Sequence, residues 1–143
     1  MAITQAVANS FKTQVLTATH NFTATTGNTF KIALFTNSAT LSKATTVYDS
    51  TDNEVTGTGY TAGGNTLTSV TPALSTDTAV CDFSDSSWST ATITARGALI
   101  YNSSASNKAV VALDFGGDKT STAGTFTIQF PAADASNAIL RLA

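Results

Sequence analysis

The chain has 143 residues and a formal net charge of −2, and only 11% of its residues are charged. That length fits one domain with its own core, and a hydrophobic share of 42% excludes a chain that is disordered by composition. The seven cationic side chains are spread along the sequence and form no basic patch, so we expect no nucleic-acid partner.

Residues 1–18 are expected to form an N-terminal amphipathic helix that ends near Ala18. Apolar residues recur within residues 3–17 at the spacing of one helix face. They are Ile3, Val7, Phe11 and Val15. The first residues lack the positive region of a signal peptide, and no apolar run approaches the about 18 residues of a membrane span. We therefore expect no export of the chain alone and no membrane partner.

Residues 29–143 are expected to form the sheet body. Their polarity comes mainly from the 28 Thr and 15 Ser of the chain, and Thr is β-branched and suits a half-exposed pleated surface. Short segments of alternating polarity, bounded by Gly, Pro, Ser and Asn, predict strands. These segments are residues 29–36, 66–70, 78–83, 90–101, 108–115, 124–130 and 137–142.

Turn signals separate several of these strands. They lie at residues 84–89, 102–107 and 116–118. One helical turn is expected within residues 41–48. Pro72 should end the strand before it or place that strand at a sheet edge, and Leu140 and Leu142 should face the core. The pattern predicts one mostly β domain over residues 1–143, an antiparallel, jelly-roll-like sandwich or barrel with one N-terminal helix.

Few residues could carry chemistry. His20 is the only histidine, so a Ser-His-Asp triad would have to use it, and no nucleophile elbow accompanies it. Cys81 is the only cysteine and lies in an alternating segment beside Asp82, which indicates a structural thiol and not a nucleophile. A hydrolase that uses His20 or Cys81 is the least favoured hypothesis. We assign no catalytic, cofactor-binding or metal-binding residue and expect no enzyme activity.

An acidic cluster leaves one ligand hypothesis open. Asp49, Asp52 and Glu54 are closely spaced oxygen ligands of the kind that Ca²⁺ prefers. The EF-hand pattern is absent, and solvated loop carboxylates are the commoner explanation of such a cluster. The sequence therefore leaves calcium binding at these three residues as an alternative.

Three aromatic residues leave a second ligand hypothesis open. Trp88, Tyr60 and Tyr101 could stack on sugars, which would make the chain a glycan- or receptor-binding module. Aromatic side chains in small β domains serve more often as core or interface anchors. Their spacing shows no clear carbohydrate signature, so both functions stay open here.

The order of several motifs resembles that of a widespread set of small structural proteins of tailed phages. Members commonly show an "ALFT"-type strand, an "EVxGxGY" turn, a "W…I…ALIY" strand and an "F…FP" ending. The corresponding parts of this chain are residues 29–36, residues 53–60, Trp88 with residues 92–101, and residues 126–131, all after the N-terminal helix. The resemblance covers nearly the whole chain and carries over no catalytic residue.

The resemblance implies a virion protein that is assembled in the host cytoplasm. The favoured position is capsid decoration: a cement protein, expected to be a homotrimer, that stabilises the head by multivalent packing on the major capsid protein. The alternative is a tail, collar or fibre-associated structural or receptor-binding module. We expect the N-terminal arm and helix to be a docking element, although the helix could equally well only cover an open face of the sheet.

Overall fold

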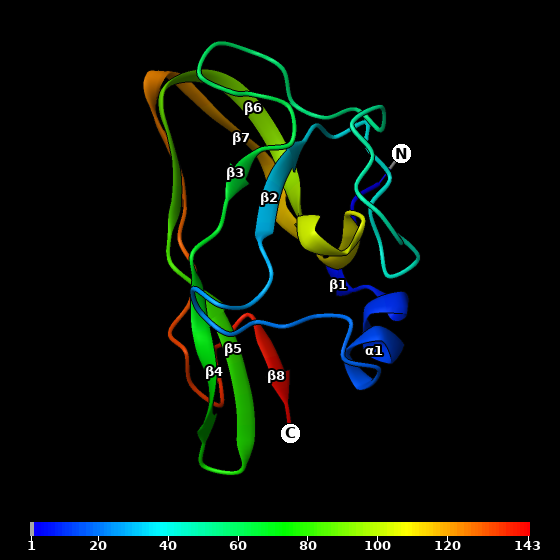
Figure 1. Cartoon of the computed structure of the whole chain (residues 1–143). Helices are drawn as coiled ribbons and strands as arrows, with labels where there is room; N and C mark the ends of the chain where they lie inside the picture. The colour runs from blue at the N-terminus through cyan, green and yellow to red at the C-terminus, as the bar shows by residue number, and fades with distance from the viewer. Residues whose placement is uncertain (1) are drawn as a thin grey trace.

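The structure is a computed structural model that describes residues 2–143. Its strands form two antiparallel sheets, of order β1-β7-β6-β2-β3 and β4-β5-β8 (Figure 1). In chain order the elements are β1 (Ala6–Val7), α1 (Asn9–Leu16), β2 (Phe30–Phe35), β3 (Asn65–Thr66), β4 (Ser69–Ser75), β5 (Thr78–Phe83), β6 (Ser86–Asn102), the 3-10 helix η1 (Ser103–Ala105), β7 (Lys108–Ile128) and β8 (Leu140–Leu142).

The prediction of a mostly β, antiparallel, sandwich-like fold with one helix is confirmed. The barrel alternative is wrong, because neither sheet closes on itself and each keeps two edge strands within the described residues. Strand β4 is one of these edges, and its pairing with β5 shifts register between Val70 and Ala73, next to Pro72. The edge position therefore accommodates a residue that has no backbone N–H to donate.

Strand β2 forms the centre of the core. Its pattern predicted one buried face, made of Phe30, Ile32 and Leu34. In the structure Ala33 and Phe35 on the other face are also fully buried. On this second face Phe35 packs edge-on against Tyr48 of the long connection between β2 and β3, with ring centroids 6.5 Å apart. The same connection also pairs with the edge of β2, where Val55 N–H donates to the Leu34 carbonyl at 2.9 Å. A strand that is covered on both sides is an internal layer of the molecule.

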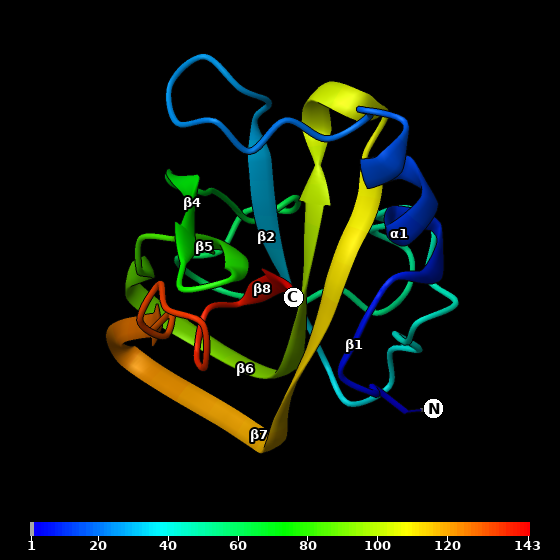
Figure 2. The same cartoon turned by 90° about the horizontal axis from the view of Figure 1, so that it is seen from below.

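Strands β6 and β7 form one long hairpin, joined through η1, as predicted for residues 90–115. The turns predicted at residues 84–89 and 116–118 are wrong, because β6 begins at Ser86 and β7 runs on to Ile128. The Gly-rich segment is a bulge: pairing passes from Gly97↔Asp114 to Ala95↔Lys119, which leaves four residues of β7 opposite one of β6. The hairpin bends there (Figure 2).

The helix is shorter than predicted. Residue 1 of the predicted segment 1–18 lies outside the described residues, Ile3 bridges to Leu41, and Ala6–Val7 pairs with β7 as strand β1. Only Asn9–Leu16 is helical. The free edge of β7 offers backbone partners to this segment, and β-branched Ile3 and Val7 suit a strand.

Two smaller predictions also need correction. Residues 41–48 contain a hydrogen-bonded turn, in which Thr45 N–H donates to the Ser42 carbonyl at 3.1 Å, and no helix. The last strand begins at Leu140 instead of residue 137, and Leu142, which was expected to face the core, is 68% exposed. Strand β8 thus extends beyond the part of the body that could cover it.

Candidate interaction surface

The glycine-containing turn at residues 53–60 is built around a buried carboxylate. Glu54 accepts hydrogen bonds from the Tyr48 hydroxyl, the Tyr60 hydroxyl and the Gly63 N–H, each at 2.7 Å. The Tyr60 oxygen in turn accepts from the Leu34 N–H of β2 at 2.8 Å. Burial, together with the nearby Glu54 carboxylate, raises the pKa of both phenols, so both remain donors near neutral pH. The network fastens the long connection to the core.

The three acidic residues of the calcium hypothesis do not converge. Asp49 accepts from the Thr51 N–H at 2.8 Å and Asp52 accepts from the Thr40 N–H at 3.1 Å, whereas Glu54 is occupied as described above. No group of three potential metal-ligating side chains forms among residues 2–143. Each carboxylate has a local structural contact of its own.

Two of the three aromatic residues of the glycan hypothesis lie inside the protein, and the third is half-buried. Trp88 is 4% exposed and packs edge-on against Phe126, and Tyr101 is 2% exposed and stacks on Tyr48 with ring centroids 4.4 Å apart. Tyr60 is half-buried beside Trp88. Sugar stacking on Trp88 and Tyr101 is therefore wrong, because their ring faces are already covered by other side chains.

His20 connects the helix to the sheet. Its Nε2 lies 2.9 Å from Gln14 Oε1 on α1, and its Nδ1 lies 3.0 Å from Asn102 Nδ2 on β6. An amide NH₂ group only donates, so we assign the neutral imidazole with the proton on Nε2. The Asn102 side chain also donates to Asn28 Oδ1 at 2.9 Å. The ring is buried and both nitrogens have partners, so His20 serves as a structural link.

The environment of His20 predicts acid sensitivity. Burial, and then the charge of Lys108, lower the pKa of His20 below its ordinary 6.5. Below pH 6.5 the unfolded chain binds a proton that the folded chain resists, so stability should be complete above pH 6.5 and fall as the pH drops towards the folded pKa. Urea unfolding at pH 7.5 and at pH 5 measures this loss.

The matched control is His20→Gln, which keeps polar atoms at the site but does not titrate. In His20→Gln the difference in the free energy of unfolding between pH 7.5 and pH 5 should shrink by the contribution of His20. Other groups, including Asp82, whose pKa is raised mainly by burial, titrate in both proteins and cancel in the comparison. An unchanged pH dependence in His20→Gln would remove His20 as the cause.

Cys81 lies half-buried on β5. Burial, and next to it the charge of Asp82, raise the pKa of its thiol to about 12. The thiolate needed for nucleophilic attack is therefore scarce near neutral pH. Its sulfur belongs to the apolar lining of a surface groove, described below.

Large apolar side chains gather at one end of the molecule. Of the six that are exposed among residues 2–143, five come from α1, β4 and β8, which lie together at the lower end in Figure 1. They are Val15, Leu16, Val70, Leu74 and Leu142, and we call this region the apolar end. Leu16, Leu74 and Leu142 are exposed by 83%, 76% and 68%. Clustered exposure of this kind marks an interaction surface.

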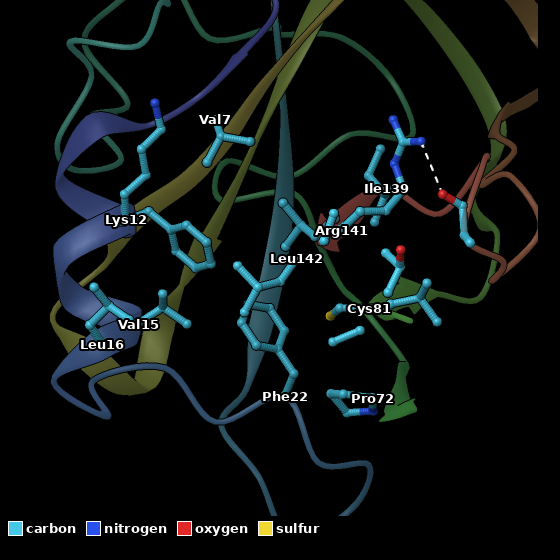
Figure 3. A pocket seen from close by; sticks show the side chains of 17 residues that line it. Val7, Lys12, Val15, Leu16, Phe22, Pro72, Cys81, Ile139, Arg141 and Leu142 are labelled. Carbon is cyan, nitrogen blue, oxygen red and sulfur yellow. Dashed lines mark hydrogen bonds between the residues drawn. The ribbon is translucent and has the colours of Figure 1, made fainter. Parts of the chain in front are cut away.

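An open groove of about 830 Å³ runs through the apolar end, between α1 and the sheet β4-β5-β8 (Figure 3). Val15 and Leu16 line the groove on the α1 side, Cys81 and Leu142 line it on the side of the sheet, and Phe22 lies between Val15 and Cys81. No Asp or Glu side chain is among the lining residues. Apolar walls and the absence of acidic side chains favour an apolar occupant.

Helix α1 combines the two roles that the sequence left open. Phe11 is buried and faces His20 with ring centroids 4.9 Å apart, so this side of the helix covers the body. Val15 and Leu16 line the open groove. The sequence did not predict that Leu74 and Leu142 would be exposed to solvent. Alternation shows which residues share a face of a strand but not whether another element covers that face.

Known proteins offer no relative from which a function could be transferred. A scan against family models finds no match, and searches of curated proteins and of solved structures find none either. In the described part of the chain, no helix has the length and apolar character needed to cross a bilayer. A function for the chain has to be inferred from its own residues.

Proposed function

We propose that this chain is a structural protein of a tailed-phage particle and that it works by packing against copies of itself and other particle proteins. The observation that carries the proposal is the apolar end, where Leu16 and Leu142 line an open groove and Leu74 is exposed to solvent on β4. By contrast, His20 and Glu54 already have hydrogen-bond partners inside the fold. The side chains left available are suited to packing.

Within the particle, we favour capsid decoration on the major capsid protein. The support is the order of the sequence motifs, together with a surface that carries few charges. A decoration protein repeats the same modest contact many times over a lattice, so the contacts together hold more firmly than any one of them.

The proposal can be tested with particles that lack the protein. Purified chain is mixed with heads and, separately, with tails from a phage whose copy of the coding sequence has been deleted, and bound protein is measured by co-sedimentation. Saturable binding to heads, with increased resistance of those heads to heat, is expected. Binding to tails alone would support the tail or collar alternative, and binding to neither would contradict a particle role.

A matched pair of variants separates the apolar end from the rest of the surface. Leu16→Ser with Leu142→Ser removes apolar side chains that are exposed, so the fold should be retained while binding falls by about tenfold or more. Val47→Ser changes a side chain that is 47% exposed but lies away from the apolar end, and should bind as the parent does. Equal binding by both variants would place the contact elsewhere.

A further inference from the structure

The rim of the groove is cationic. Lys12 and Arg141 both line the groove, and within residues 2–143 neither forms an ion pair. Lys12 Nζ bonds only to Asn9 Oδ1 at 3.2 Å, and Arg141 donates to backbone carbonyls, at 2.8 Å to that of Ser136. An apolar segment that carries a carboxylate therefore suits this groove. Two grooves packed face to face would instead bring four cations together, which opposes that arrangement.

The chain itself carries such a segment at the tip of its β4–β5 hairpin. Leu74 is 76% exposed, and Asp77, in the turn three residues later, is also exposed. All residues from Val70 to Leu74 are exposed, although Ala24 N–H donates to Thr71 Oγ1 at 3.0 Å. The hairpin projects from the body in Figure 1.

An uncovered edge strand is a surface that natural proteins usually protect or use. Strand β5 pairs with β8, whereas the outer edge of β4 presents backbone groups without a partner strand. Docking against a second molecule would cover Leu74 and hold the hairpin in place. The segment has both properties that the groove favours, an apolar side chain and a nearby carboxylate.

We propose that the occupant of the groove is the hairpin tip, residues 74–77, of a second copy of this chain. Leu74 of one copy lies against Leu16 and Leu142 of the next, and Asp77 lies beside Lys12 at the rim. The apolar contact supplies most of the binding energy, and the exposed charge pair selects the register, because such pairs contribute little energy by themselves.

The tip and the groove both belong to the apolar end, and a contact that runs from the tip of one copy to the groove of the next builds a ring when the rotation between copies closes. The inference deepens the proposed function, since it rests on the apolar end being an assembly surface, and it names the partner of that surface. It concerns the isolated chain, whereas the particle experiment concerns heads and tails. A chain that stays monomeric yet coats heads would overturn this inference and leave the proposed function in place.

The test is sedimentation equilibrium of the full chain across the micromolar range. The parent should form a closed oligomer, and Leu74→Ser should weaken the association by about tenfold or more. Asp77→Lys and Lys12→Glu should each weaken it, while the two changes together should restore it. Asp118→Lys, a charge reversal at another exposed acid, should have no effect.

Restoration by the double charge reversal distinguishes contact between these two surfaces from damage to the fold, since two damaging changes do not repair each other. Thermal unfolding of each variant confirms that it is folded. The inference is overturned if the parent remains monomeric, if Leu74→Ser associates as the parent does, or if the double reversal is no stronger than the single ones.

Discussion

Replacing Glu54 with Ala should lower the free energy of unfolding by about 3–5 kcal/mol, the usual cost of removing one partner from a buried charged network. The substitution leaves the hydroxyls of Tyr48 and Tyr60 and the Gly63 N–H without their acceptor. An unpaired donor costs about 1–3 kcal/mol where it is buried, as the Gly63 N–H is, and less at the two part-buried hydroxyls, and the truncated side chain leaves a gap. Urea unfolding at neutral pH measures the loss.

Two milder variants show whether the carboxylate is the centre of the network. Tyr48→Phe removes one donor to Glu54 and should cost about 1–2 kcal/mol. Asp49→Ala removes an exposed carboxylate that accepts only within its own turn, and should lower the free energy of unfolding far less than Glu54→Ala does. If Glu54→Ala were as stable as Asp49→Ala, the network would not be what fastens the long connection to the core.

Replacing Gly64 with Ala should destabilise the protein by at least about 3 kcal/mol, a large part of the 5–15 kcal/mol that holds a typical domain together. A Cβ at this position would lie 1.8 Å from the backbone oxygen of Ile32, and Gly64 also has φ +70°. The backbone of the central strand β2 cannot move aside without disturbing the core. Thermal and urea unfolding of the variant measure the effect.

Gly116→Ala is the matched control, because it imposes the same backbone strain without the collision. Gly116 has φ +78°, and a Cβ there would meet nothing within 4 Å. Its cost should be the left-handed penalty alone, about 1–2 kcal/mol. If Gly64→Ala and Gly116→Ala lost similar amounts of stability, the collision of a Cβ at position 64 with β2 would add no cost of its own.

The elements that the sequence predicted well are those whose signal is local. Strand β2 and the hairpin of β6 and β7 follow from period-two alternation and a Ser/Asn-rich connection. The bulge at Gly116 was mistaken for a turn, because a glycine pair permits both and only the partner strand decides between them. Segment 3–17 has helical spacing, yet Ala6 and Val7 pair with β7. This pairing depends on the free edge of β7, which forms only in the folded chain and is not visible in the local sequence.

The candidate surface was harder to predict for the same reason. Leu142 lies in an alternating segment and was expected to face the core, but no other element reaches far enough to cover it. Glu54 was grouped with Asp49 and Asp52 as a loop acid, because its three donors come from positions that only the folded chain brings together. Exposure and burial of single side chains depend on packing between elements, which alternation alone does not describe.

The most direct test of the proposed role is the number of copies of this chain in each particle, measured by quantitative mass spectrometry of gradient-purified particles. A capsid decoration protein predicts hundreds of copies, in a fixed ratio to the major capsid protein. A handful of copies would move the protein to the tail or collar. Absence of the chain from purified particles would contradict a structural role in the virion.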